Sequence, residues 1–118
     1  MDIEITVMQA KELREKNPLI LFLDVREPEE VEIGHIRETL HIPLNMIPYN
    51  LEKIPKEETL IVYCHHGMRS LKAVEYLKAK GFDNVVNLAG GIHEWSTKID
   101  PTTVSYTHLR AHGHSSIS

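Results

Sequence analysis

Cysteine is almost missing from this chain of 118 residues, in which Cys64 stands alone. A single cysteine cannot form an internal disulfide, so the sequence gives no reason to expect an oxidising compartment. Long apolar segments are missing too, since no run approaches the roughly 18–20 residues that a membrane-spanning helix needs. The start, Met1-Asp2-Ile3-Glu4, has neither the basic residues nor the apolar stretch of a signal peptide. We therefore expect a cytoplasmic protein with no membrane partner.

An excess of positive charge is also lacking. Lysine and arginine number 13 against 17 aspartates and glutamates, which gives a formal net charge of -4. Proteins that bind nucleic acids neutralise phosphates with clustered basic residues, so no nucleic-acid partner is expected. Hydrophobic residues make up 42% of the chain, close to the average of soluble globular proteins. The length fits one domain. We expect the protein to be a monomer or weak dimer.

Short apolar runs alternate with amphipathic segments over residues 1–100. The continuous apolar runs at 19–23 and 59–63 are too short for helices and are typical of strands covered on both faces. The strongest helix is predicted for 70–80, with Gly81 as its cap. The other predicted elements are strands at 3–5, 41–43 and 84–88 and helices at 6–16, 27–33, 46–54 and around Trp95. This alternation predicts an α/β fold of three layers, a mostly parallel sheet flanked by helices on both faces.

The end of the chain differs in composition. From 101 to 118, Ser, Thr and His dominate, and apolar residues are too sparse to form a core element. We predict a disordered tail and consider a non-native origin for it, such as read-through from a cloning vector. Residues 1–100 are then the folded domain.

The segment that carries chemistry is 63–70, which reads Tyr-Cys-His-His-Gly-Met-Arg-Ser. It places Cys64 at the C-terminal end of a buried strand and just before the best helix, where ligand sites of open α/β sheets gather. Gly67 allows the loop to curl so that successive N–H groups point inward and form an anion nest. A cysteine sulfur in such a nest is favoured as the thiolate, and Arg69 adds a permanent positive charge.

Cys64 also has a plainer interpretation, because a lone cysteine at the end of an apolar strand is often buried filler. The neighbouring Gly67 and Arg69 favour a reactive thiol instead. Burial works against the charged form of the sulfur, but inward N–H groups and a fixed cation act at contact distance. We therefore predict that the thiolate predominates by about pH 7.

Four segments occur in a suggestive order. They are 24–30 (Asp-Val-Arg-Glu-Pro-Glu-Glu), Gly34-His35-Ile36 with Ile42-Pro43, the loop at 63–70, and 90–95 (Gly-Gly-Ile-His-Glu-Trp). Together they resemble the rhodanese-like sulfurtransferases in their single-domain form, and the resemblance covers residues 3–98. One stretch departs from the pattern. The family usually continues Gly-His-Ile with Pro-Gly-Ala, whereas this chain has Arg37-Glu38-Thr39, which puts the local turn in doubt.

The resemblance implies an α/β sulfurtransferase that moves a sulfane sulfur in two steps, through a persulfide on the catalytic residue Cys64. A small donor such as thiosulfate supplies the sulfur, and cyanide, a thiol or a protein thiolate accepts it. No cofactor is implied. The residues expected to hold the sulfur or the donor are His65, His66, Gly67, Met68 and Arg69.

Asp24 and Arg26 suggest a catalytic acid and base, but a carboxylate and a guanidinium at a strand end are expected to be structural, bonding loop backbone or each other. His65 and His66 beside a cysteine raise the question of a metal, with His35 as a further ligand. Adjacent histidines tend to point apart, and the closely spaced Cys or His pairs of a structural zinc site are absent from the sequence. No metal site is predicted.

Two other functions stay open. Cysteine-dependent phosphatases and arsenate reductases also place a thiolate and an arginine around an anion-binding loop. Their loop is one residue longer than the four residues between Cys64 and Arg69, and the tighter loop suits a single sulfur atom. A non-catalytic binding or regulatory module on the same fold usually lacks the cysteine. Both features favour sulfur transfer.

Overall fold

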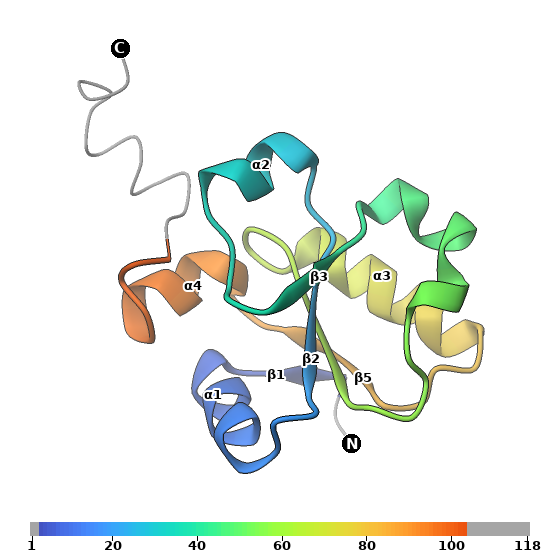
Figure 1. The fold of residues 1–118 in the computed structure, drawn as a ribbon, viewed down its shortest axis with the longest axis horizontal. Coiled ribbons are helices and arrows are strands. Elements are labelled where there is room, and N and C mark those ends of the chain that lie inside the picture. The colour runs from blue at the N-terminus through green and yellow to red at the C-terminus, as the bar shows by residue number, and fades with distance from the viewer. Residues whose placement is uncertain (1–2, 104–118) are drawn as a thin grey trace.

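The computed structural model describes residues 3–103, and its centre is a sheet of five parallel strands (Figure 1). The strands are β1 (Glu4–Ile5), β2 (Leu21–Asp24), β3 (Thr39–His41), β4 (Leu60–Tyr63) and β5 (Val85–Leu88), in the spatial order β1-β5-β4-β2-β3. The helices are α1 (Val7–Lys16), α2 (Pro28–Ile33), α3 (Met68–Ala79) and α4 (Gly91–Lys98), together with the 3-10 helices η1 (Leu44–Tyr49) and η2 (Leu51–Lys53). The predicted α/β fold is confirmed.

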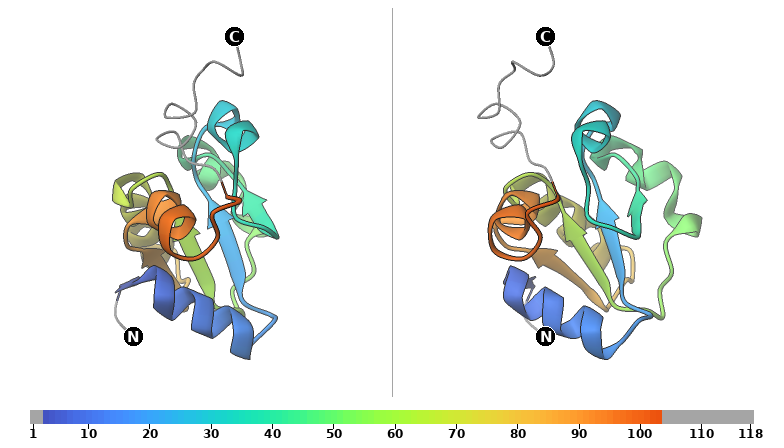
Figure 2. Two further views of the ribbon diagram at one scale, coloured as in Figure 1. Left: turned by 90° about the vertical axis from the view of Figure 1, so that its left-hand side faces the viewer. Right: turned by 60° about the vertical axis from the view of Figure 1, so that its left-hand side comes forward.

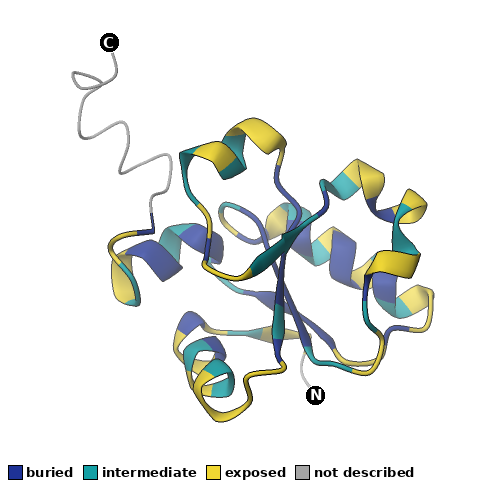
Figure 3. Cartoon of the chain, viewed as in Figure 1, coloured by how far each residue is buried: buried dark blue, intermediate teal, exposed yellow. Residues whose placement is uncertain are grey.

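Helices cover both faces of the sheet, which gives the three predicted layers (Figure 2). On one face, α3 and the two 3-10 helices pack over a core that includes Cys64. On the other face, α1 and α4 cover a second core, in which Phe22 meets the rings of Tyr63 and Trp95 edge to face. Helix α2 has no buried residue, and its ribbon alternates between exposed and intermediate positions (Figure 3).

Burial explains why the central strands are so apolar. Every residue of β4 and of β5 is buried, because a parallel strand covered on both faces has no side toward solvent. Burying one Val, Leu or Ile side chain contributes about 1.5–3 kcal/mol. Apart from Tyr63, whose ring is largely apolar, Asn87 is the one polar residue in these two strands, and it is fully buried. Such a residue requires hydrogen-bond partners.

Three boundaries differ from the predictions for physical reasons. Helix α3 begins at Met68 rather than at 70, because Gly67 takes a left-handed conformation (φ 115°) that turns the chain directly into the helix. The strand predicted at 41–43 pairs with β2 at 39–41 instead, and Pro43 beyond it has no N–H to donate. The segment at 46–54 forms 3-10 rather than α-helix, with Pro48 inside η1.

The turn before β3 contains the departure from the family pattern. Among the described residues, Glu38 is the one non-glycine residue with a positive φ (58°), and it stands where the family usually has glycine. The left-handed region costs a residue with a Cβ about 1–2 kcal/mol. The side chain of Arg14 donates to the carbonyl oxygens of Arg37 (2.5 Å) and Glu38 (3.4 Å), which holds the turn in place.

The described part of the chain ends in a turn after α4. Residues 101–103, which the predicted tail includes, belong to this turn, where Thr102 bonds the carboxylate of Asp100 and Thr103 is buried. The prediction for 104–118 lies outside the described residues. Over residues 3–103, none of the helices combines the length and the apolar character required to cross a membrane.

Candidate active site

Cys64 follows β4 at the carboxyl edge of the sheet, with 2% of its surface exposed. Its sulfur accepts hydrogen bonds from the N–H of Gly67 (3.1 Å) and from the N–H and hydroxyl of Ser70 (both 3.4 Å). Donors grouped at a helix N-terminus stabilise negative charge, so this surrounding suits an atom that carries such charge. Ser70 was not predicted as a site residue. Its place in the first turn of α3, where N–H groups have no acceptor within the helix, is the signal that identifies it.

Gly67 is the residue on which the shape of the loop depends. It is the N-cap of α3, and its left-handed backbone (φ 115°) directs its own N–H at the sulfur while its carbonyl accepts the N–H of Leu71 (3.2 Å). A residue with a Cβ is strained in this conformation. Glycine is therefore required here for backbone geometry, which makes it a structural member of the predicted donor-binding loop.

Helix α4 supports the loop from behind through backbone contacts. The N–H groups of Ile92 and His93 donate to the carbonyls of Cys64 (2.9 Å) and His65 (3.1 Å). A Cβ added at Gly91 would lie 2.5 Å from the Cys64 carbonyl oxygen and 2.4 Å from that of His65. The close approach explains why glycine stands at 91, the first residue of α4.

Asn87 links the loop to the edge strand β1. Its side-chain N–H₂ group donates to the carbonyl of Gly67 (3.1 Å) and to the carboxylate of Glu4 (2.8 Å). Asn87 is fully buried, and its side-chain oxygen has no hydrogen-bond partner among residues 3–103. This residue was not predicted as part of the site. Its signal in the sequence is a polar residue inside an otherwise apolar strand, which satisfies a buried group of the loop.

Arg69 forms a two-pronged ion pair with Glu30 of α2, with N–O distances of 2.7 and 2.8 Å. The bond to Glu30 raises the pKa of Arg69 above its usual value, with partial burial acting in the opposite direction. Partial burial of Glu30 works toward a higher pKa, but the bonds from Arg69 and from the Glu27 N–H hold that pKa below its usual range. The predicted cation, Arg69, lies beside the loop, but its guanidinium is already paired with the carboxylate of Glu30.

Asp24 and Arg26 form a second pair, directly after β2. Their side chains are 0% and 1% exposed, and the guanidinium meets both carboxylate oxygens at 2.7–3.2 Å. Arg26 also donates to the carbonyl of Gly34 (2.6 Å), and Asp24 accepts the N–H of Arg26 (3.0 Å). These two residues bond each other and loop backbone, the arrangement expected from the sequence for a structural pair.

The histidines of the loop lie against a third histidine, from α4. The ring centroids of His65 and His66 are 4.1 Å apart, and His93 lies 6.0 and 5.1 Å from them. Partial burial, followed by the neighbouring His66 and His93, lowers the pKa of His65 to about 4. His65 is therefore neutral at neutral pH. No cluster of His, Cys, Asp and Glu within residues 3–103 has the geometry of a metal site.

The model of the rhodanese-like domain matches residues 6–98. The chain belongs to the rhodanese-like domain family. Curated relatives include the putative sulfurtransferase YtwF of Bacillus subtilis, 36% identical over 98 residues, which are 83% of this chain and 94% of that protein. The thiosulfate sulfurtransferase GlpE of Coxiella burnetii is 34% identical over 92 residues (78% and 85%). A crystal structure of a rhodanese-like domain protein from Staphylococcus aureus aligns with a TM-score of 0.75, at 38% identity, over 80% of this chain and 91% of that one.

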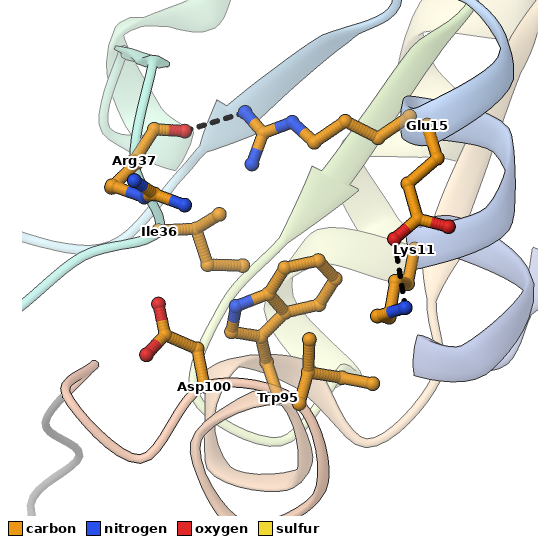
Figure 4. Close-up of a pocket in the computed structure, with 8 residues that line it drawn as sticks. Lys11, Glu15, Ile36, Arg37, Trp95 and Asp100 are labelled. Carbon is orange, nitrogen blue, oxygen red and sulfur yellow. Dashed lines mark hydrogen bonds and ion pairs between the residues drawn. The ribbon is translucent and has the colours of Figure 1, made fainter.

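This rhodanese-like domain also has a pocket of about 340 Å³ that does not include Cys64 (Figure 4). Its walls come from α1, α4 and the turn at 36–37, and Trp95 and Ile36 in those walls belong to the core on the other face of the sheet. The charged groups around it already have interactions: Lys11 bonds Glu15 (2.8 Å), and Arg14 bonds the Arg37 carbonyl. No cysteine lines this pocket.

Proposed function

We propose that the protein is a sulfurtransferase that carries a sulfane sulfur as a persulfide on Cys64. The observation that carries this proposal is the set of N–H and hydroxyl donors from Gly67 and Ser70 around a nearly buried sulfur. The same donors suit the terminal sulfur of a persulfide, which is also a single anionic atom. The sulfurtransferase names of two relatives that align over most of this chain support the same activity.

The reaction has two displacements. In the first, the Cys64 thiolate forms a bond to the outer sulfur of a donor such as thiosulfate, and sulfite leaves with the electron pair of the broken S–S bond. In the second, a thiophilic acceptor attacks the outer sulfur of the persulfide, and Cys64 leaves as the thiolate. The acceptor is cyanide in an assay and a thiol or protein thiolate in the cell. Dividing the transfer in this way is covalent catalysis, and neither step requires a cofactor.

Within the loop, the roles differ by residue. Gly67 and Ser70 donate to the sulfur, and we expect His65, His66 and Met68 to contact the sulfur donor. His66 and Met68 are exposed, and Met68 keeps 73% of its surface open to solvent. Arg69, Asp24 and Arg26 hold the surrounding segments through their ion pairs.

Phosphatase or arsenate reductase chemistry is less compatible with this arrangement. Those reactions require an arginine whose fork meets a tetrahedral oxyanion. Here both prongs of Arg69 bond Glu30, and only four residues separate it from Cys64. We therefore expect no hydrolysis of aryl phosphates above background. A purely regulatory module is disfavoured by the cysteine and its donors.

Mass spectrometry after treatment with thiosulfate tests the proposal directly. We expect Cys64 to gain one sulfur atom, about 32 Da, and to lose it again when cyanide is added. Cys64→Ala should retain the fold, show no added mass and consume no thiosulfate. A Cys64→Ala variant with substantial turnover, or Cys64-dependent phosphate release by the wild type, would contradict the proposal.

A further inference from the structure

Two ion pairs lie beside the Cys64 loop, and the charges within each pair cancel. Asp24 pairs with Arg26, and Glu30 pairs with Arg69, so these two carboxylates and two guanidinium groups sum to zero. The four groups also interact across the pairs, since Asp24 acts on Arg69 and Arg26 acts on Glu30. Arg69 lies near enough to Cys64 for the sulfur to affect its charge. A second anion at the sulfur would therefore meet a guanidinium that is already neutralised.

Glu30 is held firmly in the position that neutralises Arg69. It is the third residue of α2, and its Oε1 accepts the N–H of Glu27 (2.7 Å) in a capping box. Its side chain is 12% exposed, against 38% for Arg69. Because two interactions fix the carboxylate, a donor that competes for Arg69 must break a two-pronged ion pair.

The groups around the pair supply little further positive charge. His65 is neutral at neutral pH, because its pKa is lowered to about 4. Helix α2 carries two more carboxylates, Glu29 and Glu32, both exposed. On α4, Glu94 pairs with Lys98. Lys72, one turn beyond Arg69 on α3, is an exposed cation, whose attraction solvent and salt weaken.

We propose that Glu30 is a specificity-determining residue: by occupying Arg69, it selects sulfur donors of low charge, persulfides (R–S–SH), over dianions such as thiosulfate. This inference rests on the sulfurtransferase activity proposed above. In the favoured step, the Cys64 thiolate bonds the outer sulfur of the persulfide, the S–S bond of the donor breaks, and the inner sulfur leaves as a thiolate with the electron pair. The outer S–H proton stays on the transferred sulfur or passes to water. No dianion enters the loop and none is released.

The test compares two donors that transfer the same kind of sulfur but differ by one charge: thiosulfate, a dianion, and methanethiosulfonate, a monoanion. The variant Glu30→Gln keeps a hydrogen-bonding oxygen and the capping box but removes the negative charge. We expect kcat/KM to rise about tenfold for thiosulfate and about threefold for methanethiosulfonate, because a freed cation attracts a dianion more strongly. Glu29→Gln, on the same helix, is the matched control and should leave the ratio of the two values unchanged.

A measurement on the wild type needs no variant. Raising the salt concentration should leave kcat/KM for thiosulfate level or increase it, because the loop offers no free cation to screen. In Glu30→Gln the same salt should lower it. A wild-type value that falls steeply with salt, or equal changes for both donors in Glu30→Gln, would overturn the role of Glu30. The absence of a Cys64 persulfide with every donor, glutathione persulfide included, would instead overturn the proposed function.

Discussion

The loops after β2 and β4 begin side by side, since Asp24 lies opposite Tyr63 in the register of the sheet, yet they are built in opposite ways. After β2, two full charges are buried and each satisfies the other. After β4, the buried group is a sulfur that accepts hydrogen bonds from N–H and hydroxyl groups, while the nearby Arg69 pairs with Glu30. A charge pair of the first kind is chemically inert, because its groups have no unused bonding capacity. A sulfur of the second kind keeps its nucleophilic electron pairs while its negative charge is stabilised.

Breaking the pair after β2 should have the largest effect on stability. Arg26→Ala leaves the carboxylate of Asp24 buried without its partner, which costs about 3–5 kcal/mol of unfolding free energy. Urea denaturation followed by circular dichroism measures this loss. Arg37→Ala, at an exposed arginine of the next segment, is the matched control and should change stability by less than about 1 kcal/mol. An Arg26→Ala loss as small as that of the control would mean that the pair does not hold the β2 loop.

The second largest loss of stability is expected where α4 packs against the loop after β4. In Gly91→Ala the new Cβ meets two carbonyl oxygens of the loop at 2.4 and 2.5 Å, and we expect a loss of about 2–3 kcal/mol. Alkylation of Cys64 by iodoacetamide at pH 7 should also change, because the loop backbone must move. Gly81 also has a positive φ (94°, against 59° at Gly91), but a Cβ added there meets only the end of the Lys56 side chain, at 3.5 Å. The control Gly81→Ala should lose about 1 kcal/mol and react at the wild-type rate, and equal alkylation rates for both variants would contradict the role of Gly91.

The loop after β4 should also make the stability of the protein depend on pH, through His65. The folded protein holds a proton on His65 more weakly than the unfolded chain does, because its pKa is about 4 rather than 6.5. The contribution of neutral His65 to the free energy of unfolding is therefore fully present above pH 6.5 and is lost as the pH falls toward 4. Because the side chain is partly exposed, we expect this loss to be about 1 kcal/mol between pH 7 and 5. His65→Gln should show a smaller loss in urea titrations at the two pH values, and His35→Gln should not. A wild-type pH dependence that survives in His65→Gln would assign it to another group.

The smallest expected effect is a gain in stability, from a substitution in the turn between α2 and β3. Glu38→Gly relieves the left-handed strain of a residue with a Cβ, while the unfolded chain gains freedom. We expect a net stabilisation of about 0.5–1 kcal/mol, measured as a shift of the urea midpoint. Glu58→Gly, outside helices and strands and without a positive φ, should be destabilised or unchanged. A loss in Glu38→Gly would show that the side chain stabilises the turn.

The sequence predicted the fold and the position of Cys64 because both depend on local patterns. Short apolar runs identify buried strands, and a cysteine, a glycine and an arginine between a strand and a helix identify the loop. The partners of those residues could not be predicted in the same way. Glu30 is 39 positions from Arg69, and Asn87 is 20 from Gly67. Contacts of this kind depend on how the strands are ordered in the sheet, which no local pattern of charge or hydrophobicity records.

The placement of β5 has a consequence for biosynthesis. Strand β5 lies between β1 and β4, although it is the last of the described strands in chain order, and α4 behind it supplies the N–H groups that support Cys64 and His65. A ribosome releases the chain from its N-terminus onward, at about 5–20 residues per second. A nascent chain that ends before β5 therefore presents its thiol without the completed loop, and β1 has no neighbour in the sheet. The backbone support of the Cys64 loop is therefore complete only after α4 has been synthesised.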